Sequence, residues 1–366
     1  MKPRRLPTAL LFLAPNLLGF LVFTLVPVGL SLAGSFTNWS LRPAVPLHFA
    51  GWDNYARLFQ DRDFYFYLYN TFYLMLALPF SIAGALLLAV LLHGRFSFAR
   101  PRRAPVLAAA SAAIALGSAA VLALTGSPNL AYVVGALGLI AALGIRFGPV
   151  AYRTVFYLPY FTAGAATIIL WSQLYNPNFG LINQGLRHLA AFGGWHVAGP
   201  GWLTSTRSLL GFLPWPAHFN NGGFGLGARE AIMLMGVWGA VGGNNMILFL
   251  AGLANVPPEL HEAAEIDGAG AWARFRHVTW PQLAPTTFFV VVISVIGGLQ
   301  GGFEQARLMT FGGPAGATTT LSYYIYQQGF ERLDLGYGSA IAWVLFVLVF
   351  GLTLLQWRHG ARDGTD

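Results

Sequence analysis

The sequence contains no cysteine and very little charge. Of its 366 residues, 9% are Asp, Glu, Lys or Arg, and 56% are hydrophobic. Without cysteine there can be no disulfide, thiol nucleophile or thiolate metal site. A soluble domain carries about 25% charged residues, so this chain has too few to build a surface that faces water. The composition therefore excludes a typical soluble enzyme, a disordered chain and a nucleic-acid-binding domain, and predicts an integral membrane protein.

Lysine is also nearly absent, and catalytic motifs are missing. Because Lys2 is the only lysine, no phosphate-binding P-loop can form, and any ATP that drives this protein must bind another subunit. The glycine-rich stretch 222–227 follows no predicted strand, so we interpret it as a flexible turn. The segment His261 to Glu265 resembles a zinc-protease motif but ends in Glu265 where the second histidine is needed. We expect no catalytic residue, no metal and no cofactor on this chain.

Long uncharged runs predict eight membrane spans. A helix needs about 17–25 apolar residues to cross the hydrocarbon core. The predicted spans are 6–36, 70–92, 104–124, 130–145, 154–175, 231–254, 286–303 and 336–357. The fourth is short and could instead be a re-entrant hairpin. The first follows a basic start and is too long for an ordinary secretory signal, although cleavage near Ala33 and Ser35 is the alternative.

Basic residues orient these spans. Arginines cluster before span one, between spans two and three, between spans four and five, and after span eight. With an even number of spans, all these clusters and both termini lie on one side, which the positive-inside rule identifies as the cytoplasm. Because an even number of predicted spans precedes the loop 255–285, this loop also lies in the cytoplasm. No Asp, Glu, Lys or Arg lies inside a predicted span, which disfavours an ion pump or a proton-coupled carrier.

The loop 255–285 has the pattern of two short helices around a bend. Pro257 and Pro258 suit a first helical turn, and acidic residues follow at the positive end of the helix dipole. Gly268 and Gly270 end the helix, and we expect Pro281 and Pro285 to end the second one. Such a unit could dock in a groove of a soluble partner, or it could simply connect two spans; the pattern alone leaves both open.

The same loop resembles a known family. Glu262-Ala-Ala, three residues, Gly268, nine residues and Val278 are similar to the EAA loop of ABC importer permeases, except that Trp280 stands where the family usually has Leu before proline. Further similar stretches are 153–159, 176–183, 249–253, 312–314, 318–320, 324–328 and 336–340. Together they resemble the maltose-type branch that carries carbohydrates and glycerol-3-phosphate, over roughly three quarters of the chain.

The resemblance implies an all-α fold and a function. The chain 1–366 would be a single polytopic helical domain of about eight transmembrane helices, with both termini cytoplasmic. It would consist of a six-helix core and an inserted hairpin at 101–147, which we expect at the periphery and whose role is unknown. The residues implied to couple the loop to an ATPase are Glu262, Ala263, Ala264, Asp267 and Gly268.

The resemblance further implies a multi-subunit importer in the inner membrane. Its partners would be a second permease, two ATPase subunits that hold ATP and magnesium, and an extracytoplasmic solute-binding protein; nucleic acid is not among them. Amides and aromatic rings suit sugars, so candidates for the substrate path are Trp238, Asn244, Asn245, Gln300 and Glu304. Trp195, Trp202 and Trp215 could contact the solute-binding protein or lipid headgroups. The alternatives are an amino-acid or peptide permease and a secondary carrier.

Overall fold

The structure is a bundle of helices. The computed structural model describes residues 5–43, 45–93, 104–124, 128–147, 149–162, 164–195, 199–213 and 222–360. Within these ranges the chain forms helices and, apart from isolated bridges, no strands. The all-α fold predicted from the sequence is confirmed.

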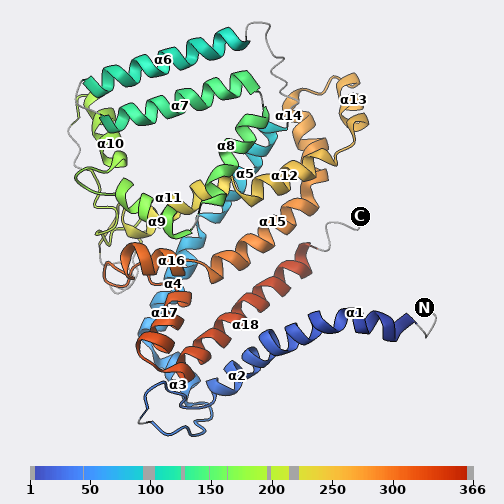
Figure 1. Ribbon diagram of the computed structural model, residues 1–366, viewed down its shortest axis with the longest axis vertical. Helices are drawn as coiled ribbons and strands as arrows, with labels where there is room; N and C mark the ends of the chain where they lie inside the picture. The colour runs from blue at the N-terminus through green and yellow to red at the C-terminus, as the bar shows by residue number, and fades with distance from the viewer. Residues whose placement is uncertain are drawn as a thin grey trace.

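Five helical stretches are long and apolar enough to cross a membrane. Among the described residues they are Leu10–Ser35, Arg62–Leu92, Ala228–Ala254, Ala271–Thr310 and Leu335–Arg358. They are built from α1 (Arg5–Phe20), the π-helical turn η1 (Leu21–Leu25), α2 (Val26–Ser35), α4 (Arg62–Met75), α5 (Leu78–Leu92), α11 (Ala228–Val241), α12 (Asn244–Ala254), α15 (Trp280–Gln300) and α18 (Leu335–Gly360). The beginning of α1, the end of α18 and the short helix α13 (Pro258–Ile266) lie at the same end of the bundle (Figure 1). The helices α3 (Asp53–Gln60), α10 (Leu181–Phe192) and α17 (Leu321–Tyr326) lie at the opposite end.

In the described residues, the predicted span 154–175 corresponds to two helices that are bent at a break. Helices α8 (Pro149–Phe161) and α9 (Gly164–Leu174) meet at an angle of 94°. Pro159 removes a backbone donor near the end of α8. Gly164 begins α9 directly against the Glu304 carboxylate, where a Cβ atom would overlap Oε2. The bend turns α9 across the bundle, where Ile168 and Trp171 are buried.

The inserted segment forms an antiparallel hairpin at the edge of the molecule. Its helices are α6 (Ala104–Leu124) and α7 (Pro128–Phe147), and they lie along the upper edge in Figure 1. Alanine and glycine allow close packing between them: a Cβ on Gly138 would overlap the side chain of Ala115. The apolar stretches of α6 and α7 are shorter than those of the five long helices. The count of eight spans therefore stays a prediction.

The expectation that Pro281 and Pro285 end a helix is also wrong. Helix α14 (Ala271–Arg274) passes through the π-helical turn η2 (Phe275–Thr279) directly into α15, which contains both prolines. The N–H of Trp280 donates to the carbonyl of Phe275, five residues back. This widened turn lies immediately before Pro281, in the first turn of α15, where a missing amide donor is tolerated.

Helices α11 and α12 are separated at a glycine pair that packs against α8. A Cβ on Gly242 would overlap the carbonyl oxygen of Phe156, whereas nothing lies within 4 Å of a Cβ on Gly239, one turn earlier. Close backbone contact at this break therefore requires glycine at position 242.

We expect Gly242→Ala to destabilise the protein by about 1–3 kcal/mol, the usual cost of overpacking, because α8 must move away from the break. Gly239→Ala is the matched control and should leave stability unchanged or slightly raised, since alanine favours a helix. Thermal unfolding of the two purified variants in the same detergent measures the difference. Equal melting midpoints for both variants would contradict this account of the break.

Candidate functional site

The EAA-like loop forms a helix, a bend and a second helix. Helix α13 follows Pro257 and carries no buried residue. The chain then turns at Gly268, whose φ of +78° lies in the left-handed region. The N–H of Gly268 donates to Glu265 O (3.0 Å) and that of Ala269 donates to Ala264 O (2.8 Å), so the bend satisfies carbonyls at the end of α13.

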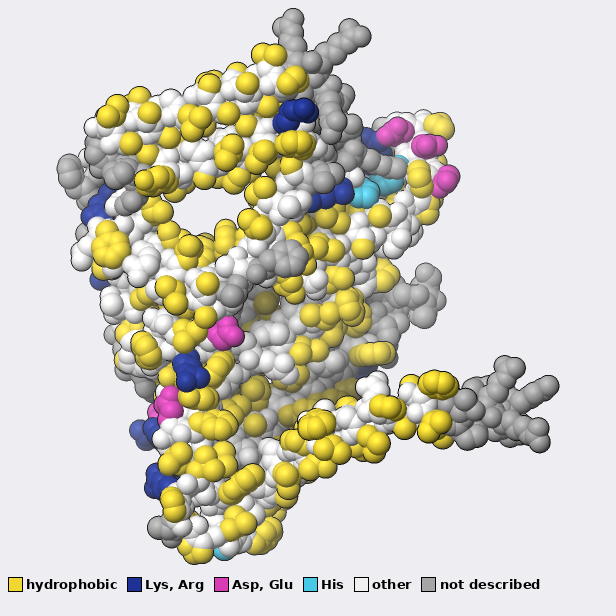
Figure 2. Space-filling model, in the orientation of Figure 1, with side chains coloured by type: hydrophobic (Ala, Val, Ile, Leu, Met, Phe, Trp, Pro, Cys, Tyr) yellow, Lys and Arg dark blue, Asp and Glu magenta, His cyan; other side chains and the backbone are white. Residues whose placement is uncertain are grey.

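The face of this loop that points away from the bundle is exposed and acidic. Glu262, Ala263, Asp267 and Gly268 are exposed, and Ala264 is half-buried. The side chain of Ile266 is 87% exposed. Acidic side chains gather at the tip of α13, at the right of the space-filling view (Figure 2). The five residues that the resemblance assigns to coupling thus form one continuous projection that a partner could contact.

The base of the projection is held to the bundle. Arg274 on α14 forms an ion pair with Glu265 on α13. Val256 and Thr279, at the two ends of the loop, are buried. A force applied to α13 would therefore be transmitted into α12 and α15, the two long helices that the loop connects.

Two of the five candidates for the substrate path flank α9. The ring of Trp238 on α11 lies 5.4 Å from that of Trp171, edge to face. Glu304, on the short helix α16 (Phe303–Gln305), lies against Gly164 at the beginning of α9. Both side chains are substantially exposed.

The other three candidates lie along α12 and α15. Asn245 donates a hydrogen bond of 3.3 Å to Ser294 Oγ, while the neighbouring Asn244 is exposed. Gln300 has an exposed side chain at the end of α15, and its carbonyl accepts a hydrogen bond from Ser322. Gln300 and Glu304 are separated by the break at Gly301 and Gly302. The structure therefore divides these residues between α9 and the α12–α15 region and does not gather all five around one enclosed cavity.

A buried charged cluster lies at the beginning of α11, although the sequence predicted that the span begins only at residue 231, after Arg229 and Glu230. Arg229 is 2% exposed and Glu230 is 5% exposed. Arg229 donates from Nε and Nη2 to Asn70 Oδ1 (3.0 and 2.8 Å) and from Nε to Ala317 O. Glu230 accepts from Tyr73 Oη and from the N–H groups of Leu209 and Gly227. These bonds join α4, α11 and the loops that contain Leu209 and Ala317.

The three outer tryptophans separate into different environments. Trp202 is buried and donates to Asn183 Oδ1 (2.8 Å), so the expectation that it lies at the surface is wrong. Trp195 is exposed and lines a cleft of about 950 Å³ together with Thr204 and Arg207. Trp215 lies outside the described residues.

Comparison with known proteins places this fold in a family. A family model described as "Binding-protein-dependent transport system inner membrane component" matches residues 135–359. A probable ABC transporter permease of Bacillus subtilis strain 168 is 30% identical over 352 residues, which cover 95% of this chain and 88% of the relative. The chain belongs to this permease family.

Two further comparisons extend the relation. The sn-glycerol-3-phosphate transport system permease protein of Yersinia enterocolitica is 36% identical over 211 residues; the match spans 58% of this permease and 62% of the relative, less than two thirds of its length. The crystal structure of a bacterial ABC transporter involved in the import of the acidic polysaccharide alginate has a TM-score of 0.67 at 22% identity, covering 99% of this permease and 98% of that chain. The likeness to the alginate transporter shows that the two chains share a fold.

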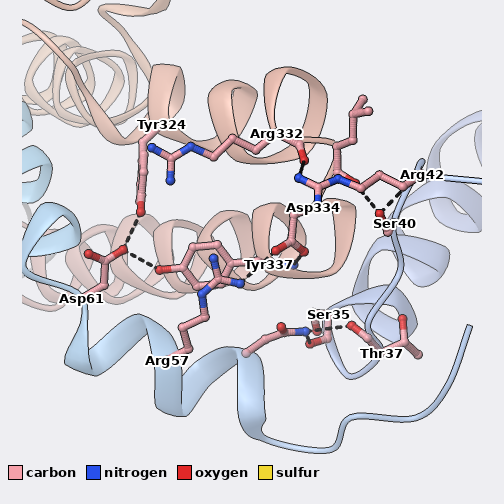
Figure 3. Close-up of polar contacts among 12 residues, drawn as sticks. Ser35, Thr37, Ser40, Arg42, Arg57, Asp61, Tyr324, Arg332, Asp334 and Tyr337 are labelled. Atoms are coloured by element: carbon pink, nitrogen blue, oxygen red, sulfur yellow. Dashed lines mark hydrogen bonds and ion pairs between the residues drawn. The ribbon is translucent and has the colours of Figure 1, made fainter. Parts of the chain in front are cut away.

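The end of the permease opposite α13 contains a second polar network (Figure 3). Asp61 lies between the hydroxyls of Tyr324 and Tyr337, and both donate to its Oδ2. Arg57 lies over the ring of Tyr337 and forms an ion pair of 2.8 Å with Asp334. The network connects the segment before α4 with α17 (Leu321–Tyr326) and α18.

The electrostatics of this network stabilise the Asp61 carboxylate. Burial alone would raise the pKa of Asp61, but hydrogen bonds from Tyr324, Tyr337 and the Asp63 N–H, together with the charge of Arg57, outweigh it and hold the pKa below its usual value. A lowered folded-state pKa contributes stability above the unfolded pKa of about 4, and that contribution is lost as the pH falls through the folded-state pKa.

We expect Asp61→Asn to lower the melting midpoint at pH 7 and to flatten its decline between pH 5 and pH 3. Asp63→Asn is the matched control, because Asp63 is exposed and its side chain forms no hydrogen bond with the described residues. Thermal unfolding of wild type and both variants at pH 7, 5, 4 and 3 tests this. A wild-type decline no steeper than that of Asp61→Asn would show that Asp61 contributes nothing.

Proposed function

We propose that this permease is a membrane-spanning subunit of an ATP-driven importer for a sugar or a glycerol-3-phosphate-like solute. The observation that carries the proposal is the acidic helix α13, which projects from the bundle with no buried residue and is joined firmly to α12 and α15. A connector with no partner has no need for such an exposed, preformed surface. The glycerol-3-phosphate permease relative and the alginate importer support the substrate class.

In this proposal α13 fits into a cleft of an ATPase subunit that holds ATP and magnesium. Glu262 accepts hydrogen bonds or pairs with a basic group there, and Ala263 and Ala264 permit close approach. Asp267 and Gly268 complete the bend that fixes the direction of the helix. When two ATPase subunits close, the rigid loop moves α12 and α15, and the solute path alternates between the two sides of the membrane.

The solute path in this proposal lies between this permease and a second, homologous one. The exposed side chains of Trp238, Asn244, Gln300 and Glu304 then face the partner rather than lipid, and Asn245 lines the path beside Ser294. An extracytoplasmic solute-binding protein delivers the solute to the outer loops, and the cleft beside Trp195 is a surface that it could contact. No cofactor is assigned to this chain.

The experiment that tests the proposal is purification of the tagged chain from its native membranes, followed by reconstitution in vesicles. The expected complex holds two copies of an ATPase and a second permease, and it takes up a radiolabelled sugar only when ATP and the solute-binding protein are present. Uptake of amino acids or peptides instead of sugars would show that the proposed substrate class is wrong. Uptake without an ATPase would contradict the importer itself.

A further inference from the structure

A second surface of the same loop has a different chemistry from its acidic tip. An open cleft of about 640 Å³ lies between α5 and the segment that leads into α15. It is lined by Leu86, Trp272, Phe275, Arg276, His277 and Trp280. Neither the coupling role nor the solute path uses these residues.

Three aromatic rings form one wall of this cleft. The rings of Trp272 and Phe275 stack at 5.7 Å with an interplanar angle of 26°, and Trp280 follows at 6.4 Å from Phe275. Trp272 is nevertheless 70% exposed, and Trp280 is also open to the surroundings. Exposed indoles at the end of a membrane-spanning helix are typical of the boundary between hydrocarbon and headgroups, where their apolar and polar edges are both satisfied.

The charge of the cleft is positive. Arg276 is exposed and forms no ion pair with any described residue, whereas Arg274, two positions earlier, is paired with Glu265. His277 lies beside it, with Nδ1 3.0 Å from the carbonyl oxygen of Ala273. In Figure 2 the acidic side chains lie at the outer tip of α13, while basic and histidine side chains lie nearer the body of the molecule. The loop thus presents one sign of charge outward and the other toward the bundle.

The cleft runs along α5, away from the end of that helix. Leu86 lies on α5 six residues before its last residue, Leu92, which corresponds to about 9 Å along the helix. Arg153 donates to the carbonyl of Leu92, so a charged side chain lies at this end of α5. The cleft therefore extends from a cationic mouth at the helix ends into an apolar zone beside Leu86.

We propose that this cleft binds an anionic phospholipid of the surrounding leaflet, with the phosphate and its negative headgroup at Arg276 and His277 and the upper acyl chain between Trp272, Trp280 and Leu86. The proposal rests on the helices crossing a membrane, and it goes beyond the proposed transport function. Charge complementarity selects this occupant: a cationic mouth above an apolar wall fits an anionic lipid, while the acidic α13 fits a basic protein surface.

Tryptophan quenching by brominated lipids tests the proposal. The full chain is placed in phosphatidylcholine nanodiscs that contain 20% of either dibromo-phosphatidylglycerol or dibromo-phosphatidylcholine. The quenching at the cleft is the tryptophan quenching of wild type minus that of the Trp272→Phe, Trp280→Phe double variant. We expect phosphatidylglycerol to be preferred by about fivefold, the factor that one basic residue near a bilayer supplies. Arg276→Gln should remove this preference without changing the melting midpoint, because Arg276 is exposed.

The matched control is Arg358→Gln, at the end of α18 on the same side of the bundle and away from the cleft. An equal loss of preference in both variants would overturn the site, since it would show only general attraction of basic residues to anionic lipid. Equal quenching by the two lipids in wild type would also overturn it. Loss of the preference on addition of the ATPase would assign the cleft to that subunit. Because the assay needs no transport, its failure leaves the importer proposal standing.

Discussion

Replacing Gly268 with proline is expected to abolish ATP-driven uptake while the permease remains in the membrane at the wild-type level. Proline fixes φ near −65°, and Gly268 has a φ of +78°. Proline also removes the N–H that donates to Glu265 O. The bend must therefore open, and α13 would point in a different direction. Since α13 buries no residue, the bundle itself should fold normally.

Smaller changes in the same loop separate conformation from charge. Gly268→Ala should reduce uptake, because a left-handed alanine costs roughly 1–2 kcal/mol. Gly270→Ala is its matched control: a Cβ meets nothing at either position, but Gly270 has a φ of −67° that alanine accepts readily. Glu262→Lys reverses the charge on the exposed face and should also uncouple ATP hydrolysis from uptake. Radiolabelled uptake and ATPase rate, measured on the same vesicles, report both effects. Normal uptake by Gly268→Pro at wild-type abundance would contradict the coupling role.

Replacing Arg229 with alanine is expected to cause the largest loss of stability. The substitution leaves Asn70 Oδ1 and Ala317 O buried without their donor, and buried unsatisfied groups cost about 1–3 kcal/mol each. It also removes the positive charge that interacts with Glu230. The expected destabilisation is about 3–5 kcal/mol, as found when a buried charge loses its partner.

The control for this prediction is Arg62→Ala, an exposed arginine in the first turn of α4, which should shift the melting midpoint little. Arg229→Lys tests geometry separately from charge. A lysine cannot place two donors on one amide oxygen as the guanidinium does, so we expect it to recover only part of the loss. Thermal melting at a fixed scan rate and the amount of protein in the membrane are the measurements. An Arg229→Ala midpoint equal to that of Arg62→Ala would show that the cluster does not hold this end of the bundle together.

The parts of the fold that depend on local sequence could be predicted. Helix α13 and its bend follow from Pro257, the acidic first turn and Gly268, all within a dozen residues. Most long spans follow from uncharged runs, since length and hydropathy are local properties. Family membership could be predicted because the EAA-like spacing lies in one continuous stretch.

The parts that depend on distant contacts could not be predicted. The bend between α8 and α9 is fixed where Gly164 meets Glu304, and these residues are far apart in the chain. The burial of Arg229 depends on Asn70 and Ala317, which lie on two other elements. Its only sequence signal was an Arg-Glu pair immediately before an uncharged run, and such pairs also end ordinary loops. Pro281 was predicted to end a helix, because no sequence pattern indicates the π-helical turn that precedes it.

Single-cysteine cross-linking tests the central claim that α13 is the contact with an ATPase. The chain contains no cysteine of its own, so Ala263→Cys, on the exposed face of α13, can carry one photoactivatable label. The control is Ala56→Cys, which is exposed on α3 (Asp53–Gln60) at the opposite end of the bundle. In the assembled complex we expect the label at position 263 to capture the ATPase subunit and the label at position 56 to leave it free. Capture from position 56, or none from position 263 in a complex that still transports, would contradict the account.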